Sequence, residues 1–351
     1  MAQGISSGEA LATNAYRYYF PLVRNLGQVE RFVTTGLDAM PPARFNAFSH
    51  ARGLAGPADD TPRSMAQLDL SVGPLLLDVP AAGDRYFVLQ FVDAWTNDIA
   101  YLGTRSSGAD AVSAVILPPG RTGPLPAGAP ADAIVIPAST GIVSIVGRYA
   151  CDGPADLPAV HALQEQLVLS QLRESFAPAA GIALPEEVDA ELTFWEQARC
   201  WSLAYPPAEH DVEYALAFAD LGLVDADSPF PQLDAPTRRF LIAGAEAGRF
   251  AVETAVQDAW APGIHAHDYN VDFFGPGTID APEWRIDDPE ARFTARAVAA
   301  HADLRGAHGY ETEYAREHRA PHRPAGPPAA AAPASAPASA PPPVSTQPFS
   351  G

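Results

Sequence analysis

Short apolar runs of strand length dominate the chain between about Pro74 and Arg148. The runs LLLDVP, RYFVLQFVDAW, SAVILPPG, AIVIPAST and GIVSIVGRYA are rich in Val, Ile and Leu, and Gly, Pro or Ser separates them. Gly83 and Asp84, between the first two, suit a hairpin turn. No helix of about ten residues fits between the runs, so the crossovers that a parallel sheet needs are missing. The pattern predicts an antiparallel β-sandwich.

Beyond Arg148 the apolar positions recur at helical spacing. Asp156 is placed to cap a helix whose apolar face continues to Leu172. Because strands come first and helices afterwards, the chain is expected to be an α+β protein. Three further helices are expected over about 185–203, over 212–221 with Gly222 as the stop, and from the cap Asp234 toward Val256.

The chain from about Pro321 consists almost entirely of Pro, Ala and Ser. Proline at this density blocks helices and sheet ladders, so we expect a disordered tail, with a proline-rich ligand for another domain as the alternative. The predicted organisation is an arm over 1–15, a sandwich-like domain over 16–156, a helical region over 157–260, a remnant of or lead-in to a second domain over 261–320, and the tail over 321–351.

The charge balance excludes several classes of function. The 22 basic residues, all of them Arg, stand against 42 acidic ones, which gives a net charge of −20. Such a chain is not expected to bind nucleic acid, whose phosphates need basic surface, and it is poorly suited to anionic membranes. Because Lys is absent, Schiff-base catalysis and a Walker-type phosphate loop are excluded.

Compartment and cofactors are predicted mainly from what the sequence lacks. There is no signal-like start and no apolar run near the roughly 20 residues of a membrane span, so we expect a cytoplasmic protein. Cys151 and Cys200 are expected to be buried thiols, although one disulfide is possible. No dinucleotide fingerprint is present, and no cofactor is expected. The oligomeric state is left open.

Four residues were weighed as metal ligands or as structural groups. His265, His267 and Asp268 could form part of a metal site, because two His at i and i+2 share one face of a strand. No third His is well placed, so a surface loop without metal is the favoured interpretation. His161, on the first predicted helix, is expected to be a partly buried structural ring.

The run VLQFVDAWTNDIAYLGTRSSG, at Val88 to Gly108, resembles the hallmark of the domain of unknown function 1254 family. TPRSMAQLDLSVGPLLLDVP precedes it, and a segment containing GRYACDGPAD follows. The resemblance extends over roughly Tyr16 to Tyr314. It implies a β-rich, sandwich-like domain, a helical linker and, usually, a second jelly-roll-like domain called domain of unknown function 1214. Carbohydrate interaction has been suggested for the family from this architecture.

The chain departs from the family pattern in three respects. Many members begin with an export signal, which is missing here. Asp60 and Thr61 remain from an Asn-x-Asp-Thr-Leu-Tyr-like element that has otherwise changed, and the usual Trp before LDL is Gln67. The Pro/Ala tail stands where the second domain should develop, so that domain is expected to be truncated or missing.

The strongest candidate site is the DAWTN run, residues 93–97. Alternation along a strand places Asp93, Trp95 and Asn97 on one side, with Thr96 between them. A carboxylate, an indole and an amide together suit a small hydroxyl-rich or carbohydrate ligand. In the alternative interpretation Trp95 belongs to the core, and Asp93 and Asn97 cap turn amides.

A looser set of charged residues surrounds this run in the sequence. An Arg at a strand end can clamp a carboxylate or a phosphate, and it can equally brace loops by pairing with an Asp. The set comprises Asp60, Arg63, Asp69, Arg105 and Arg148.

Three functions remain open on the sequence alone. A small-molecule or glycan binding protein is favoured, because no complete catalytic motif was found. The alternative is a hydrolase- or lyase-type enzyme that uses Asp93 and Asp60 with Arg105. The third possibility is a degenerate, purely structural family member. Convergence of the candidate residues in one cavity would favour ligand binding or catalysis over a structural role.

Overall fold

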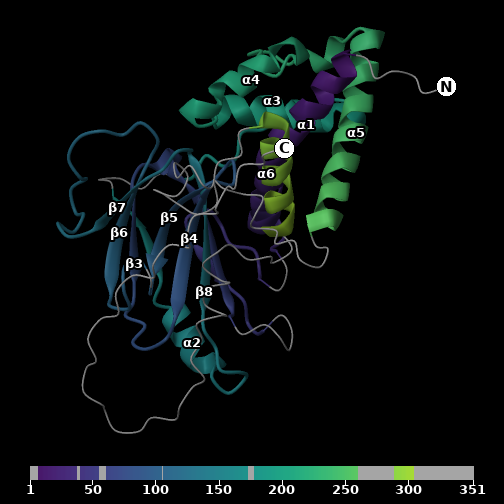
Figure 1. Ribbon diagram of the computed structural model, residues 1–351. Helices are drawn as coiled ribbons and strands as arrows, with labels where there is room; N and C mark the ends of the chain where they lie inside the picture. The colour runs from purple at the N-terminus through teal and green to yellow at the C-terminus, as the bar shows by residue number, and fades with distance from the viewer. Residues whose placement is uncertain are drawn as a thin grey trace, which may run out of the picture. The chain divides into compact units, whose positions relative to one another are not determined.

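A computed structural model describes residues 7–37, 40–54, 61–104, 106–172, 178–259 and 288–303, and these contain two β-sheets (Figure 1). The five-stranded sheet is antiparallel throughout, and its strands run in the order β1 (Phe48–His50), β2 (Arg63–Asp69), β8 (Ile142–Tyr149), β4 (Phe87–Asp93), β5 (Asp98–Gly103). The four-stranded sheet has the order β7 (Ile134–Pro137), β6 (Val112–Leu117), β3 (Leu75–Val79), β9 (Val168–Gln171).

The two sheets share one apolar core, as the sandwich prediction required. Alternate residues of β4, Phe87, Leu89 and Phe91, are fully buried, and Leu75 and Leu77 of β3 belong to the same cluster. This alternation is that of strands with one face on a core. The five predicted strand runs are all strands, so this part of the prediction is confirmed.

Two details of the predicted sheet are wrong. Gly83 and Asp84 do not form a hairpin turn, because β3 and β4 lie in different sheets and the turn carries the chain from one sheet to the other. The pair β6 and β7 is parallel, with Val115 opposite Val135. The long loop between these two strands, over 118–133, supplies the return that a parallel pair needs without a crossover helix.

The helical part is built around α1 (Ser7–Thr34), which packs against α3, α5 and α6 (Figure 1). Tyr19, Leu22 and Leu26 recur at spacings of three and four and are fully buried. This helix was not predicted, and residues 7–15, expected in an arm, are part of it. The other helices are α2 (Leu157–Gln164), α3 (Thr193–Ala204), α4 (Val212–Ala217), α5 (Ala235–Ala259) and α6 (Pro289–Asp303).

Short 3-10 helices lie among the α-helices at 190–192, 209–211, 219–221 and 230–232, and another at 70–72 follows β2. Asp234 caps α5 as predicted, since its Oδ1 accepts from the backbone N–H of Thr237 at 2.6 Å. Gly222 ends the 3-10 turn after α4 in the left-handed conformation, with φ of 75°. The helix predicted to continue to Leu172 ends at Gln164 instead, and the helix predicted from 185 begins as a 3-10 turn at Ala190.

The remaining expectations concern disulfides, membrane spans and the tail. Neither Cys151 nor Cys200 forms a disulfide. Among the helices that the structure describes, none combines the length and the apolar character that crossing a membrane requires. The predicted tail over 321–351 lies outside the described residues, as does most of the segment predicted over 261–320.

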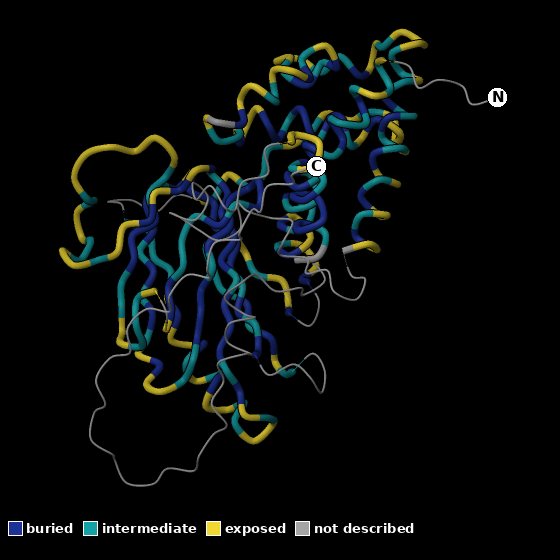
Figure 2. The backbone as a smooth tube through the Cα atoms, in the orientation of Figure 1, coloured by how far each residue is buried: buried dark blue, intermediate teal, exposed yellow. Residues whose placement is uncertain are grey.

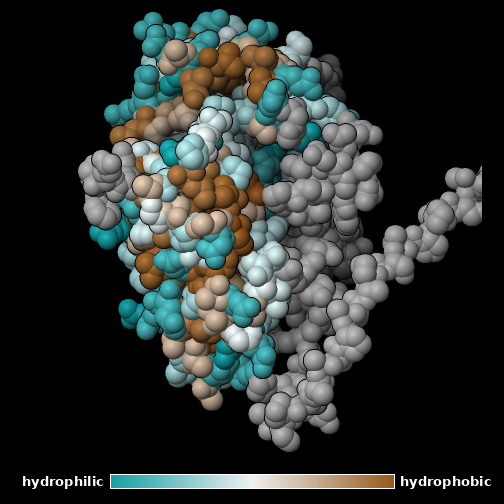
Figure 3. Space-filling model, turned by 90° about the vertical axis from the view of Figure 1, so that its left-hand side faces the viewer, coloured by the Kyte–Doolittle hydropathy of each residue, from teal (hydrophilic) through white to brown (hydrophobic). Residues whose placement is uncertain are grey.

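The turn that joins β4 to β5 enters the core of the helical part. Ala94, Trp95 and Ile142 belong to the same buried cluster as residues of α1, α3, α5 and α6. Buried residues, dark blue in Figure 2, occur both in the strands and in α1 and α6. On the side of β6 and β7 the surface carries apolar as well as polar groups, and Val135 and Val168 of the two edge strands are exposed (Figure 3).

Candidate functional site

The DAWTN run forms the tight connection between β4 and β5. Asp93 Oδ1 accepts from the backbone N–H groups of Trp95 at 2.9 Å and Asn97 at 2.8 Å. Its Oδ2 accepts from the Asn97 side-chain amide at 3.1 Å and from the Ser139 hydroxyl at 2.8 Å. Thr96 adopts a positive φ of 68°, which the turn requires. Asp93 therefore holds the turn, as in the capping interpretation.

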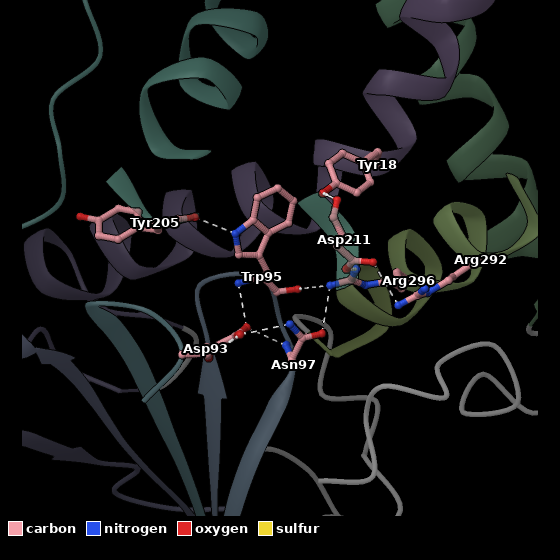
Figure 4. A network of polar contacts seen from close by, with 9 residues as sticks. Tyr18, Asp93, Trp95, Asn97, Tyr205, Asp211, Arg292 and Arg296 are labelled. Carbon is pink, nitrogen blue, oxygen red and sulfur yellow. Dashed lines mark hydrogen bonds and ion pairs between the residues drawn. The ribbon is translucent and has the colours of Figure 1, made fainter. Parts of the chain in front are cut away.

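Trp95 is a core residue. Its side chain is 1% exposed, and its ring lies against Tyr18 and Tyr19 with centroids 5.3 and 5.8 Å away. The indole N–H donates to the backbone carbonyl of Tyr205 at 2.7 Å (Figure 4). A ring buried in this way has no face that a sugar could stack on, so the core interpretation of Trp95 fits the structure.

A buried ion-pair network joins the same turn to the helices (Figure 4). The Arg296 guanidinium of α6 donates to the backbone carbonyl of Trp95 at 3.2 Å and to Asn97 Oδ1 at 3.0 Å. It also pairs with Asp211 at 2.7 Å, and Arg292 pairs with the other oxygen of Asp211 at 3.2 Å. The Trp95 carbonyl and the Asn97 side chain are therefore hydrogen-bonded to α6, and these contacts attach the turn to the helices.

Burial and charge act against each other at this turn. Burial raises the pKa of Asp93, while the hydrogen bonds from Asn97 and Ser139 and the charge of Arg296 lower it. Burial also raises the pKa of Tyr18, and the charge of Asp211 adds to that effect. Both groups serve as fixed hydrogen-bonding partners: the Tyr18 hydroxyl donates to the Asp211 backbone carbonyl at 3.2 Å.

The structure separates the predicted site residues. Asp93 pairs with Val143 at the start of β8, whereas Arg148 lies near its end, five residues or about 17 Å further along the strand. Arg148 is 6% exposed and its Nη1 lies 3.4 Å from Thr61 Oγ1. Arg148 therefore belongs to the other end of the sandwich and does not share a site with the DAWTN turn.

The other candidate residues have structural roles or lie outside the description. Asp69 braces loops, since its carboxylate accepts from the backbone N–H groups of Ser71 at 2.8 Å and Gly181 at 2.6 Å. Arg63 stands opposite Arg148 in the sheet. Within the described ranges, no three His, Cys, Asp or Glu side chains come together in a way that could hold a metal ion. Outside the described residues lie Asp60, Arg105, His265, His267 and Asp268.

A cavity of about 320 Å³ lies between β1, the segment that follows it, and α2. It is at the Arg148 end of the sheet, because α2 reaches the backbone there: Gln164 Nε2 donates to the carbonyls of Pro62 at 3.3 Å and Arg63 at 3.4 Å. The polar and charged side chains that can bind a ligand in its lining are those of His50, Arg52, His161, Gln164 and Glu165. Phe48 adds an aromatic ring.

Two residues of this lining each have a buried polar atom without a hydrogen-bond partner among the described residues. Gln164 is fully buried and its amide nitrogen is used, but its Oε1 accepts nothing. His161 Nε2 is also buried and unbonded. The two residues are three apart on α2, so their side chains share one face of the helix. Buried polar atoms are normally paired, which makes this face of α2 exceptional.

The opposite wall of the cavity is formed by β1. His50 Nδ1 lies 2.9 Å from Ser64 Oγ on the neighbouring strand, and the rings of Phe48 and His50 stack with centroids 5.8 Å apart. Burial lowers the pKa of His50, the nearby His161 lowers it further, and the charge of Glu165 opposes both. The cavity thus combines a flat ring pair with a hydrogen-bonding wall.

A second cavity, of about 650 Å³, lies beside Asp69, Ser71 and Tyr205. It is wide and open, and its polar groups already have partners. Asp69 caps backbone amides, and the Tyr205 hydroxyl accepts from the backbone N–H of Ala183 at 3.1 Å. It therefore offers a ligand fewer unpaired hydrogen-bonding groups than the cavity beside α2.

The sequence pattern did not indicate the residues of this cavity. His161 is predicted from the sequence as a structural ring, and no motif marks His50, Arg52, Gln164 or Glu165. A polar Gln among the apolar positions of a predicted helix was the available signal, since Gln164 sits next to Val160 and Leu163 on that face. Nothing in the sequence placed β1 beside it.

The comparisons with known proteins agree with the fold. Residues 39–171 match the family model described as "Protein of unknown function (DUF1254)". The predicted resemblance is thereby confirmed over these residues, which contain both the DAWTN turn and the cavity. Arg296, Asp211 and Tyr205, the helical partners of the turn, lie beyond the matched segment.

The chain is similar to solved structures over most of its length. Among them is the crystal structure of the VPA0106 protein from Vibrio parahaemolyticus, with a TM-score of 0.62 and 15% sequence identity, covering 87% of this chain and 69% of that one. At this identity the likeness concerns the fold alone. No curated protein matches the chain.

Proposed function

We propose that the protein binds a small hydroxyl-rich molecule in the cavity between β1 and α2, without chemistry of its own. The observation that carries the proposal is the pair of buried, unbonded atoms Gln164 Oε1 and His161 Nε2. An unsatisfied buried polar atom costs about 1–3 kcal/mol, a cost that a bound ligand removes. A ligand hydroxyl can donate to Gln164 Oε1, and a second can pair with His161 Nε2, once these side chains turn toward the cavity, because neither atom has accessible surface in the structure.

The size and shape of the cavity support a compact ligand. A volume of about 320 Å³ is at the lower end of ligand pockets, which suits a single sugar ring or a polyol more than a large cofactor. The Phe48 ring adds apolar surface of the kind that packs against C–H groups of a sugar. The carbohydrate-sized ligand expected from the sequence is thus retained, at a different place in the fold.

The enzyme alternative has less support. It needs Asp93 as an acid or base, yet both oxygens of Asp93 accept hydrogen bonds from the turn and from Ser139. The side chain is 2% exposed, so a substrate could not reach it without opening the turn.

The test is saturation-transfer NMR with a mixture of monosaccharides and polyols on the full chain. The variant His161→Phe keeps a ring in place and removes Nε2, and we expect it to lose the ligand signals. Gln166→Ala is the control. Gln166 lies two residues beyond the end of α2, is exposed and does not line the cavity. Equal signals from wild type and a folded His161→Phe variant would contradict the proposed site, as would the absence of any ligand signal.

A further inference from the structure

Resting on the proposed function, we infer that the ligand carries a carboxylate as well as hydroxyls, so that its class is a hydroxy acid of sugar-acid size. The inference comes from the unequal chemistry of the two walls of the cavity. The wall formed by α2 carries the exposed Glu165 carboxylate, and the unbonded acceptor Gln164 Oε1 is buried on the same helix. Beyond the end of β1 the lining carries the guanidinium of Arg52.

The α2 wall selects for hydroxyl donors. Gln164 Oε1 can only accept, and the Glu165 carboxylate accepts as well when ionised. A ligand carboxylate placed against this wall would face a like charge and an acceptor, with no hydrogen between them. The hydroxyl end of the ligand is therefore the end that meets α2.

The Arg52 side of the cavity selects for an anion. A guanidinium presents paired N–H groups that match the two oxygens of a carboxylate. Arg52 is exposed and lies two residues beyond the end of β1, and among the described residues it has no ion-pair partner. The cavity lining holds Arg52 against the single acid Glu165, whereas the whole chain has 42 acidic residues and 22 basic ones. The lining therefore lacks the excess of acidic groups that the rest of the chain carries.

Other ligand classes fit these walls less well. An amine would be attracted by Glu165 and repelled by Arg52. A neutral sugar would satisfy Gln164 and leave the guanidinium without a ligand group. A hydroxy acid uses both walls at once, with its hydroxyls toward α2 and its carboxylate toward Arg52.

The experiment compares D-glucuronate with D-glucose, which share a ring and differ in the carboxylate, by isothermal titration calorimetry at low salt. We expect glucuronate to bind at least about ten-fold more tightly to the wild type. Arg52→Gln should remove this preference. Arg44→Gln is the matched control: it makes the same change of net charge at an exposed position outside the cavity, and the preference should persist.

Each outcome separates this inference from the proposed function. Equal affinities for glucuronate and glucose would overturn the carboxylate and leave the binding function standing. An equal loss in Arg44→Gln and Arg52→Gln would show a general charge effect and would also overturn it. If the NMR mixture yields ligands that depend on His161 but glucuronate does not bind, the inference alone fails. If no ligand depends on His161, the proposed function fails with it.

Discussion

The indole nitrogen of Trp95 lies 2.7 Å from the backbone carbonyl oxygen of Tyr205, 110 residues further along the chain. This bond joins the tip of the β4–β5 connection to the end of α3, inside a cluster of apolar side chains from the helices. Asn25 of α1 reaches the same turn, since its amide donates to the carbonyls of Asp93 at 3.0 Å and Ala94 at 3.1 Å. The densest part of the family-like run thus acts as the attachment between sandwich and helices.

Replacing Trp95 should destabilise the protein without touching the proposed ligand site. Trp95→Ala leaves a large cavity, and we expect it to lower the free energy of unfolding by about 3–5 kcal/mol. Trp95→Phe keeps a ring and loses the bond to Tyr205, so its effect should be smaller. Urea denaturation followed by circular dichroism measures both. A loss below about 1 kcal/mol for Trp95→Ala would contradict the core assignment.

The ion pair between Arg296 and Asp211 should be equally important for stability. Arg296 is 5% exposed, so Arg296→Met leaves the groups of the turn without their cation and leaves the buried Asp211 carboxylate with Arg292 alone. Removal of one partner from a buried pair typically costs about 3–5 kcal/mol. Arg249→Met is the control, because the pair of Arg249 with Glu253 is largely exposed and should contribute little. Similar denaturation midpoints for the two variants would refute the buried network.

Local pattern was sufficient for most strands and for the cap at Asp234. The strand runs were recognisable because short stretches rich in Val, Ile and Leu end at Gly, Pro or Ser, a signal that depends on neighbours along the chain only. The segment at Leu167 shows where this fails. Its spacing continues a helical stripe, yet Val168–Gln171 pairs with β3. Without β9, the backbone N–H and C=O groups on that side of β3 would be unpaired, and pairing with β9 gives them hydrogen-bond partners. Tertiary pairing overrode the local pattern.

The cavity and the ion-pair network could not be predicted from the sequence for a related reason. His50 and Gln164 meet only because β1 pairs with β2, and because α2 contacts the start of β2. Arg296 and Asn97 are 199 residues apart and meet through the packing of α6. The sequence did contain the two alternatives for Trp95, but only the packing of the helices decides between them.

The ion pair of Arg85 with Asp156 leads to a prediction about local stability. Asp156 stands at the start of α2, where a cap was predicted, but its carboxylate binds the Arg85 guanidinium at 2.5 and 2.7 Å and makes no cap bond. Both side chains are about one-fifth exposed. Asp156→Asn should therefore lower the free energy of unfolding by about 1.5–3 kcal/mol, with unchanged helix content.

The control for this change is Asp234→Asn. Asn caps a helix as well as Asp does, so the start of α5 should be unaffected by that variant. Chemical denaturation and far-ultraviolet circular dichroism on the two variants distinguish the roles. If Asp156→Asn reduces helix content while leaving stability intact, Asp156 acts as a cap and the assignment to the ion pair is mistaken.

The last prediction concerns the acid side of the stability profile and His50. Burial lowers the pKa of His50 below its ordinary value of 6.5, so the folded protein holds this ring neutral. The unfolded chain takes up a proton there as the pH falls through 6.5, while the folded chain resists it until the lower folded pKa is reached. The unfolded state therefore binds more protons in this window, and stability rises with pH across it.

His50→Gln removes the titration and keeps a polar side chain beside Ser64. The difference in unfolding free energy between wild type and variant should then grow in favour of the wild type between about pH 5 and pH 7, and level off above. Thermal or urea unfolding at half-unit pH steps measures it, and two parallel profiles over this range would show that the ring is not held neutral by burial.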